Sequence, residues 1–251
     1  VAEQPVQSEK CPKKAYRTPD EGVRGNEPFL YISCEDAELF NPANQSIDNI
    51  LHLICEADES FRYQYLYFGR LSPSFVSVLN THSILAKDLP VIMNYRDAYL
   101  AMVSKENGRY QGDNINYHNI GIEGMKRAMK EIYHPEAVIH SKKGGDGIEL
   151  ALSFTDSKGN QGLAILKLNE IARNGTRFLE AHIITSIYGR RNIQTYIHNA
   201  VESGRMIYKK EEEISQGIAP VQYRRNINDL SSTDSISQAT PKSNTFSKKL
   251  K

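Results

Sequence analysis

The chain has 251 residues, of which 39% are hydrophobic and 24% are charged. This is enough for one substantial apolar core without disulfide support. Because no run of about 18 apolar residues occurs and the N-terminal residues are polar, we expect neither a spanning helix nor a secretory signal. Three widely spaced cysteines favour neither a disulfide framework nor a zinc site, which indicates a reducing compartment. Since the chain starts at Val1, we expect an excised or processed piece.

The formal net charge of +1 hides an asymmetry along the chain. Residues 1–116 carry 11 basic and 16 acidic side chains, whereas residues 117–210 carry 14 basic and 9 acidic ones. An excess of lysine and arginine in one segment is typical of polyanion binding. We therefore place the candidate binding surface in the C-terminal half.

The first part of the chain predicts an N-terminal arm and helix over residues 1–60. Prolines scattered among charges over residues 1–45 are typical of a loosely packed arm with at most one short strand. Helical or alternating apolar patterns then indicate four elements. These are a helix within Ser46–Glu59, an aromatic strand at Phe61–Phe68, a short helix from near Ser72 and a strand at Leu89–Met93.

The second part predicts one α+β domain over residues 61–212. Asn119–Tyr133 has the periodicity of an amphipathic helix, and Pro135 ends it. Four strands follow with short connections, which favour antiparallel pairing; then come a helix and a short strand. We expect these strands at Ala137–His140, Ile148–Thr155, Leu163–Leu168 and Leu179–Ile187, the helix at Asn192–Ser203, and the last strand at Met206–Tyr208.

The expected fold class is therefore α+β, with a helix packed on a curled four-stranded antiparallel sheet, a second covering helix, and an N-terminal, mainly helical or irregular region. After Gly217 large apolar residues are few, and residues 213–251 are predicted to be a disordered tail.

Two clusters of polar residues lie near expected element ends. His118 precedes the amphipathic helix, where it could act as acid or base beside a bound phosphate, although Asn119 next to it could simply cap the helix. His140, Ser141, Lys142 and Lys143 leave a strand in a glycine-containing turn, which suits phosphate binding but also describes an ordinary solvated turn.

The third cluster is the densest and lies at the end of the last long strand. Thr185, Ser186, Tyr188 and Arg190 combine hydroxyls with a guanidinium, a set compatible with phosphate, although these groups could also serve only the sheet end. Lys167 in a neighbouring strand is a secondary candidate, since edge-protecting lysines are common.

These residue types suffice for RNA cleavage without a metal. Such cleavage needs a base for the 2′-hydroxyl, an acid for the leaving 5′-oxygen, and donors around the phosphorane-like transition state. No phosphate-binding loop, dinucleotide turn, zincin motif or hydrolase elbow occurs in the sequence. We expect no cofactor and no metal.

Three segments carry a resemblance to a known group of proteins: Ala137–Ser141, Leu163–Leu168 and Ile183–Arg190. They resemble the phage-associated barnase, EndoU, colicin and RelE-like (BECR-fold) nuclease domains of MuF-type and large polyvalent phage proteins. The resemblance extends to the helix at Asn192–Ser203 and to upstream segments. It matches Ser186 and Tyr188 to a recurring Ser-x-Tyr-Gly and Ser141 to a strand-end serine, which here is followed by lysines where related sequences often have an arginine.

The resemblance implies a toxin-like, metal-independent endoribonuclease that yields a 2′,3′-cyclic phosphate. His118, His140, Ser186 and Tyr188 are the expected catalytic residues. The expected substrate-binding residues are Ser141, Lys142, Lys143, Thr185, Arg190 and Lys167.

Two alternatives remain open at this point. One is a catalytically inactive module of a phage or effector protein that binds RNA or protein. The other is a nucleotide- or protein-modifying toxin. The expected partners are RNA such as tRNA and either an immunity protein or a phage capsid protein, without membrane contact. The expected location is the cytoplasm of the bacterium or of a target cell, with delivery by a phage as one route.

Overall fold

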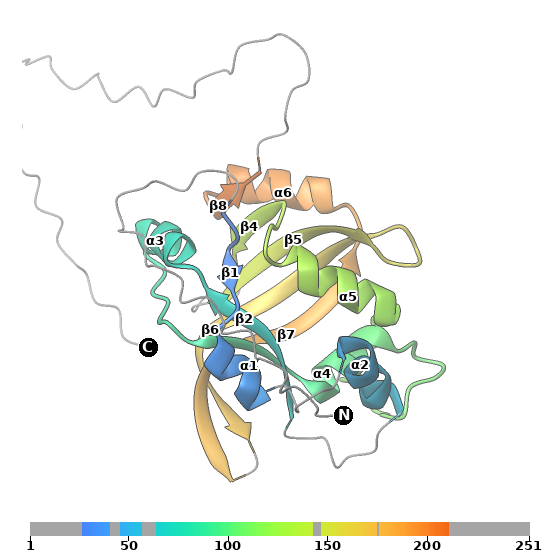
Figure 1. Cartoon of the computed structure of the whole chain (residues 1–251). Coiled ribbons are helices and arrows are strands. Elements are labelled where there is room, and N and C mark those ends of the chain that lie inside the picture. Colours follow the sequence, from blue (N-terminus) through green and yellow to red (C-terminus); the bar gives the residue numbers. More distant parts are fainter. Residues whose placement is uncertain (1–26, 41–45, 57–63, 143–146, 175, 211–251) are drawn as a thin grey trace, which may run out of the picture. The chain divides into compact units, whose positions relative to one another are not determined.

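The computed structural model describes residues 27–40, 46–56, 64–142, 147–174 and 176–210, which lie in one compact unit (Figure 1). In chain order the elements are β1 (Leu30–Tyr31), α1 (Cys34–Phe40), α2 (Ile47–Glu56), β2 (Tyr65–Leu71), α3 (Pro73–Thr81), β3 (Pro90–Asn94), α4 (Tyr95–Met102), α5 (Gly121–Glu131), β4 (Ala137–His140), β5 (Gly147–Thr155), β6 (Gln161–Asn174), β7 (Arg177–Arg190), α6 (Ile193–Glu202) and β8 (Met206–Lys209). No helix in these ranges is both long and apolar enough to cross a bilayer.

The strands form one curled eight-stranded sheet in the order β1-β2-β3-β7-β6-β5-β4-β8 (Figure 1). β3 pairs with β7 in parallel, and the other neighbouring strands of this sheet pair antiparallel. The expected four-stranded antiparallel sheet is therefore wrong. β4 to β7 do form an antiparallel unit, but the parallel pairing of β3 with β7 adds the early strands to it. The paired residues of β3 and β7 lie about 90 positions apart along the chain, where local patterns carry no pairing information.

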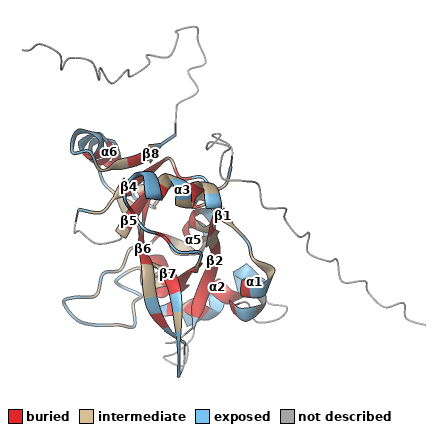
Figure 2. Ribbon diagram, turned by 90° about the vertical axis from the view of Figure 1, so that its left-hand side faces the viewer, coloured by how far each residue is buried: buried red, intermediate tan, exposed pale blue. Residues whose placement is uncertain are grey.

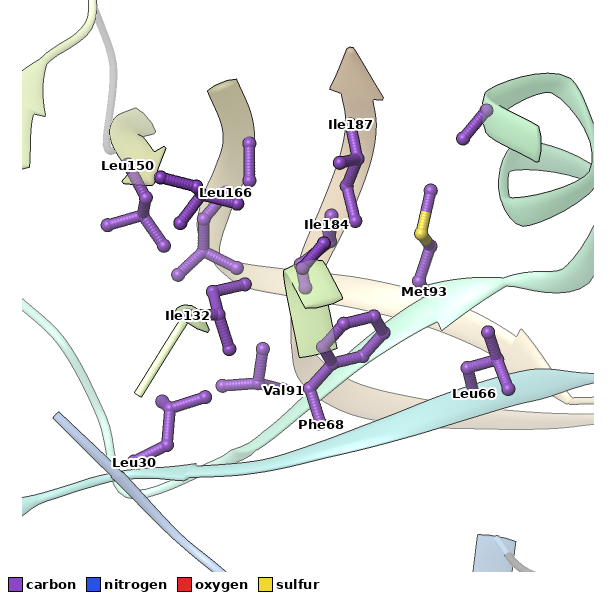
Figure 3. Packing of buried hydrophobic residues seen from close by; sticks show 14 of the residues in the cluster. Leu30, Leu66, Phe68, Val91, Met93, Ile132, Leu150, Leu166, Ile184 and Ile187 are labelled. Carbon is purple, nitrogen blue, oxygen red and sulfur yellow. The ribbon is translucent and has the colours of Figure 1, made fainter. Parts of the chain in front are cut away.

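The main core lies on one face of the sheet. Side chains from β2, β3, β5, β6 and β7 converge there with residues of α2 to α5, as Figure 3 shows for Phe68, Met93 and Ile184 among others. Figure 2 shows the same pattern over the whole described part, with buried residues along the strands and exposed residues on the outer helix surfaces. The helices on this face pack against the sheet because each presents an apolar stripe to the strands.

The opposite face of the sheet carries two smaller apolar clusters. α6 covers β4, β5 and β6 at one end, with Ile193, Ile197 and Ala200 buried against them. α1 covers the other end, where Phe40 packs with residues of β2 and β3. The buried Asp36 of α1 pairs with Arg70 of β2, and this ion pair fixes α1 against the sheet.

Several element predictions are confirmed, and the differences have local causes. α2, α3, α5 and α6 lie where helices were expected, whereas α1 falls in the proline-rich arm and α4 follows β3 directly, and neither was predicted. β6 and β7 are longer than expected because their pairing continues to Asn174 and Arg177. Cys55 is a free thiol. The predicted tail, residues 213–251, lies outside the described residues.

Candidate active site

A β-bulge in β7 determines which of its side chains share a face. Two consecutive residues of β6, Ile165 and Leu166, pair with Ser186 and Ile184. Thr185 between them is therefore an extra residue on β7. Such a bulge shifts the alternation of side chains by one position and is often found next to functional sites.

The bulge places three of the singled-out side chains together. Ile184 and Ile187 both belong to the main core, although they are three residues apart. Ser186 lies directly opposite Ile165, and Tyr188 packs with the cluster beneath α6. By alternation Ser186, Tyr188 and Arg190 lie on the face opposite the main core.

His118 reaches this face from the connection between α4 and α5, residues 103–120. Its backbone N–H donates to the carbonyl of Leu100 over 2.9 Å, which ties the end of the connection to α4. The hydroxyl of Tyr117 accepts from the N–H of Tyr110 and donates to its carbonyl, at 2.7 and 2.9 Å. These bonds fold the connection back on itself and hold His118 in place.

His118 and Ser186 are the central pair of the candidate site. His118 Nε2 and Ser186 Oγ are 3.0 Å apart, within hydrogen-bonding distance. The imidazole also stacks on the Tyr188 ring with 5.2 Å between centroids, and Arg190 Nη1 lies 3.4 Å from the Tyr188 hydroxyl. Burial lowers the pKa of His118 below its ordinary value of 6.5. The imidazole is therefore neutral near pH 7 and can accept a proton.

A second group of polar side chains surrounds Tyr196 of α6. The guanidinium of Arg190 lies 3.7 Å from the centre of the ring, and Arg205 and Lys142 approach it at 5.7 and 5.9 Å. The Tyr196 hydroxyl donates to the buried carboxylate of Glu149 on β5. Burial and then Glu149 raise the pKa of Tyr196. Arg190 belongs to both groups and so connects them.

Side chains at the end of β4 and in the turn that follows it point alternately to the two faces of the sheet. Ile139 packs beneath α6 and Val138 in the main core. By alternation His140 lies on the main-core face and Ser141 on the face of the candidate site. The structure thus brings Ser141 toward the same side as His118 but places His140 on the other one.

The remaining predicted site residues are less closely associated with the pair. Lys167 is exposed and lies two residues beyond Ile165 on the same face of β6. Thr185 is the bulge residue itself and is half-buried. Lys143 lies outside the described residues.

Three members of the site were missed by sequence reasoning: Glu149, Tyr196 and Arg205. Glu149 is the one charged residue in the apolar run Ile148–Leu152, and a buried charge in such a run is itself a signal. Tyr196 follows the apolar spacing of its helix, and this spacing alone indicates a core residue. Arg205 follows the helix-ending Gly204 and has no local pattern that marks it.

The described residues contain no group of three or more histidine, cysteine, aspartate or glutamate side chains arranged to hold a metal ion.

Comparison with known families gives one match. Residues 109–216 match the model of the phage MuF-C-terminal domain. This similarity supports an association with phage. The matched segment contains His118, Glu149, Ser186, Tyr196 and Arg205, whereas β1 to β3 and α1 to α4 lie outside it. No curated protein and no solved structure matches the chain.

Proposed function

We propose that this protein is a metal-independent endoribonuclease of phage origin. The observation that carries the proposal is the contact between His118 Nε2 and Ser186 Oγ, beside Tyr188 and Arg190. An imidazole with a lowered pKa, two hydroxyl donors and a guanidinium are the groups that cleavage through the 2′-hydroxyl requires. The BECR-like nuclease resemblance of this segment points to the same reaction.

In the proposed reaction neutral His118 removes the proton of a 2′-hydroxyl. The 2′-oxygen forms a bond to the adjacent phosphorus, and the bond from phosphorus to the 5′-oxygen breaks. Ser186 turns from His118 to donate to a nonbridging oxygen, Tyr188 donates to another, and Arg190 offsets the developing charge. The leaving 5′-oxygen takes a proton from water. The products are a 2′,3′-cyclic phosphate and a 5′-hydroxyl.

The test uses total bacterial RNA and a matched oligodeoxynucleotide, both in EDTA. We expect the full chain to cut RNA but not DNA, and to leave cyclic phosphate ends. His118→Ala should slow cleavage by roughly 10²–10⁴-fold, the usual contribution of a general base. Ser186→Ala should slow it by about 10²-fold, because one donor to the transition state is lost. His198→Ala is the matched control, since His198 is exposed on the outer side of α6.

Two outcomes would contradict the proposal. RNA that stays intact at a large excess of folded protein would favour the binding-module alternative, which keeps the basic surface without catalysis. Cleavage that is unchanged in both His118→Ala and Ser186→Ala would show that another site, or a contaminating nuclease, cuts the RNA.

A further inference from the structure

The proposed reaction uses Arg190 but leaves the other residues around Tyr196 without a role. Three cationic groups, from Lys142, Arg190 and Arg205, lie within 6 Å of the centre of this ring, and the ring's hydroxyl donates to the carboxylate of Glu149. By formal charge the cations outnumber the carboxylate by two, since three positive groups meet one negative group. The cluster therefore attracts an anion.

Two buried donors of this cluster point to the same kind of ligand. Among the described residues, Arg190 Nε and Arg205 Nη2 are buried and have no hydrogen-bond partner. The rest of Arg205 is held in place, because Nη1 donates to the carbonyl of His140 at 2.9 Å and Nε to the Ser203 hydroxyl at 3.0 Å. An unsatisfied buried donor is unfavourable, and a phosphate oxygen that displaces the neighbouring side chains far enough to accept from it removes that penalty.

We infer that Arg190, Arg205 and Lys142 form a subsite for a second phosphate of the same RNA strand, next to the phosphate that reacts at His118 and Ser186. Arg190 joins the two positions, because it contacts both Tyr188 and Tyr196. Its guanidinium already covers one face of the Tyr196 ring, so no base can stack on that face. The subsite therefore recognises the charge of the RNA backbone and not the identity of a base. The assignment of RNA as the ligand rests on the proposed function.

The test measures binding without cleavage. The probe is a short 2′-O-methyl oligoribonucleotide, which lacks the attacking hydroxyl, and its binding is followed by fluorescence anisotropy over a range of salt concentrations. We expect Arg205→Gln to weaken binding roughly tenfold and to reduce the slope of log Kd against log salt by about 0.7, the value for one phosphate contact of a single strand. Lys142→Gln should weaken binding about threefold with the same change in slope.

Controls separate this effect from folding and from overall charge. Arg177→Gln removes the same charge at the exposed tip of the β6–β7 hairpin and should leave the slope unchanged. Thermal unfolding tests whether each variant is folded. If Arg205→Gln is destabilised, Lys142→Gln still tests the subsite, because Lys142 is exposed and its replacement should not affect folding. An unchanged slope in folded Arg205→Gln and Lys142→Gln overturns the inference, as does an equal loss in Arg177→Gln.

The two proposals fail in different ways. If the chain cuts RNA but the subsite variants bind the probe like wild type, the subsite is wrong and the nuclease stands. If the chain cuts no RNA but the subsite variants lose affinity with the expected change in slope, the subsite is supported and the protein is an RNA-binding module without catalysis.

Discussion

The bulge at Thr185 makes a quantitative prediction for the stability of the protein. Because of the bulge, Ile187 packs in the main core and Ser186 faces the candidate site. Ile187→Ala removes three carbons at about 0.8 kcal/mol each, which gives roughly 2.4 kcal/mol. The cavity left behind adds up to about 2 kcal/mol, so we expect a loss of about 2–4 kcal/mol in the free energy of unfolding. Ser186→Ala should change it by less than about 1 kcal/mol.

The assay is urea unfolding at pH 7.5, followed by far-UV circular dichroism because the chain has no tryptophan. Each variant is compared at constant m-value, so that a shift in midpoint reports stability alone. A strand with regular alternation would turn Ser186 toward the core together with Ile184. The reasoning is refuted if Ile187→Ala costs less than about 1 kcal/mol while Ser186→Ala costs more than about 2 kcal/mol.

Three further predictions concern the rest of the fold. His182 is fully buried, and burial lowers its pKa below 6.5, so the unfolded chain binds the proton more readily than the folded one. Urea midpoints should therefore be constant above pH 6.5 and fall as the pH drops below it. In His182→Gln the midpoints should depend less on pH. Asp36→Ala breaks the buried ion pair of α1 and should cost about 3 kcal/mol, whereas Asp88→Ala at an exposed pair should cost less than about 1 kcal/mol. In Gly162→Ala the new Cβ would lie 2.3 Å from the Phe154 ring, and thermal unfolding should show a loss of about 1–3 kcal/mol.

Local periodicity predicts the elements of this fold better than it predicts how they are joined. The apolar spacing of Asn119–Tyr133 and Asn192–Ser203 is enough to locate α5 and α6, because each helix buries one stripe. The same logic misses α4, since Tyr95–Met102 follows β3 without any turn sequence that marks a boundary. The parallel pairing of β3 with β7 depends on contacts across about 90 residues, which no local window contains.

For the candidate site too, the sequence predicts individual residues better than it predicts the contacts between them. Residue chemistry singled out His118 and Ser186, and the structure brings them to 3.0 Å although 68 positions separate them in the chain. It does not bring His140 to them, because one step of alternation at the end of β4 decides between two faces of the sheet. Glu149 and Arg205 were missed because their role depends on a shared neighbour, Tyr196, which the sequence alone presents as a core residue.

The candidate site lies next to the point where the pairing of β3 with β7 ends. β3 pairs with β7 only as far as Ile184, one residue before the bulge, and then turns into α4. From Ser186 onward, β7 keeps β6 as its neighbour on one side, and the connection that carries His118 lies near its other side. The end of the parallel pairing thus opens one edge of a central strand, and the bulge turns a serine toward the face that this edge borders. A polar pair can form there without interrupting the main core, because Ile184 and Ile187 still close that core from the opposite face.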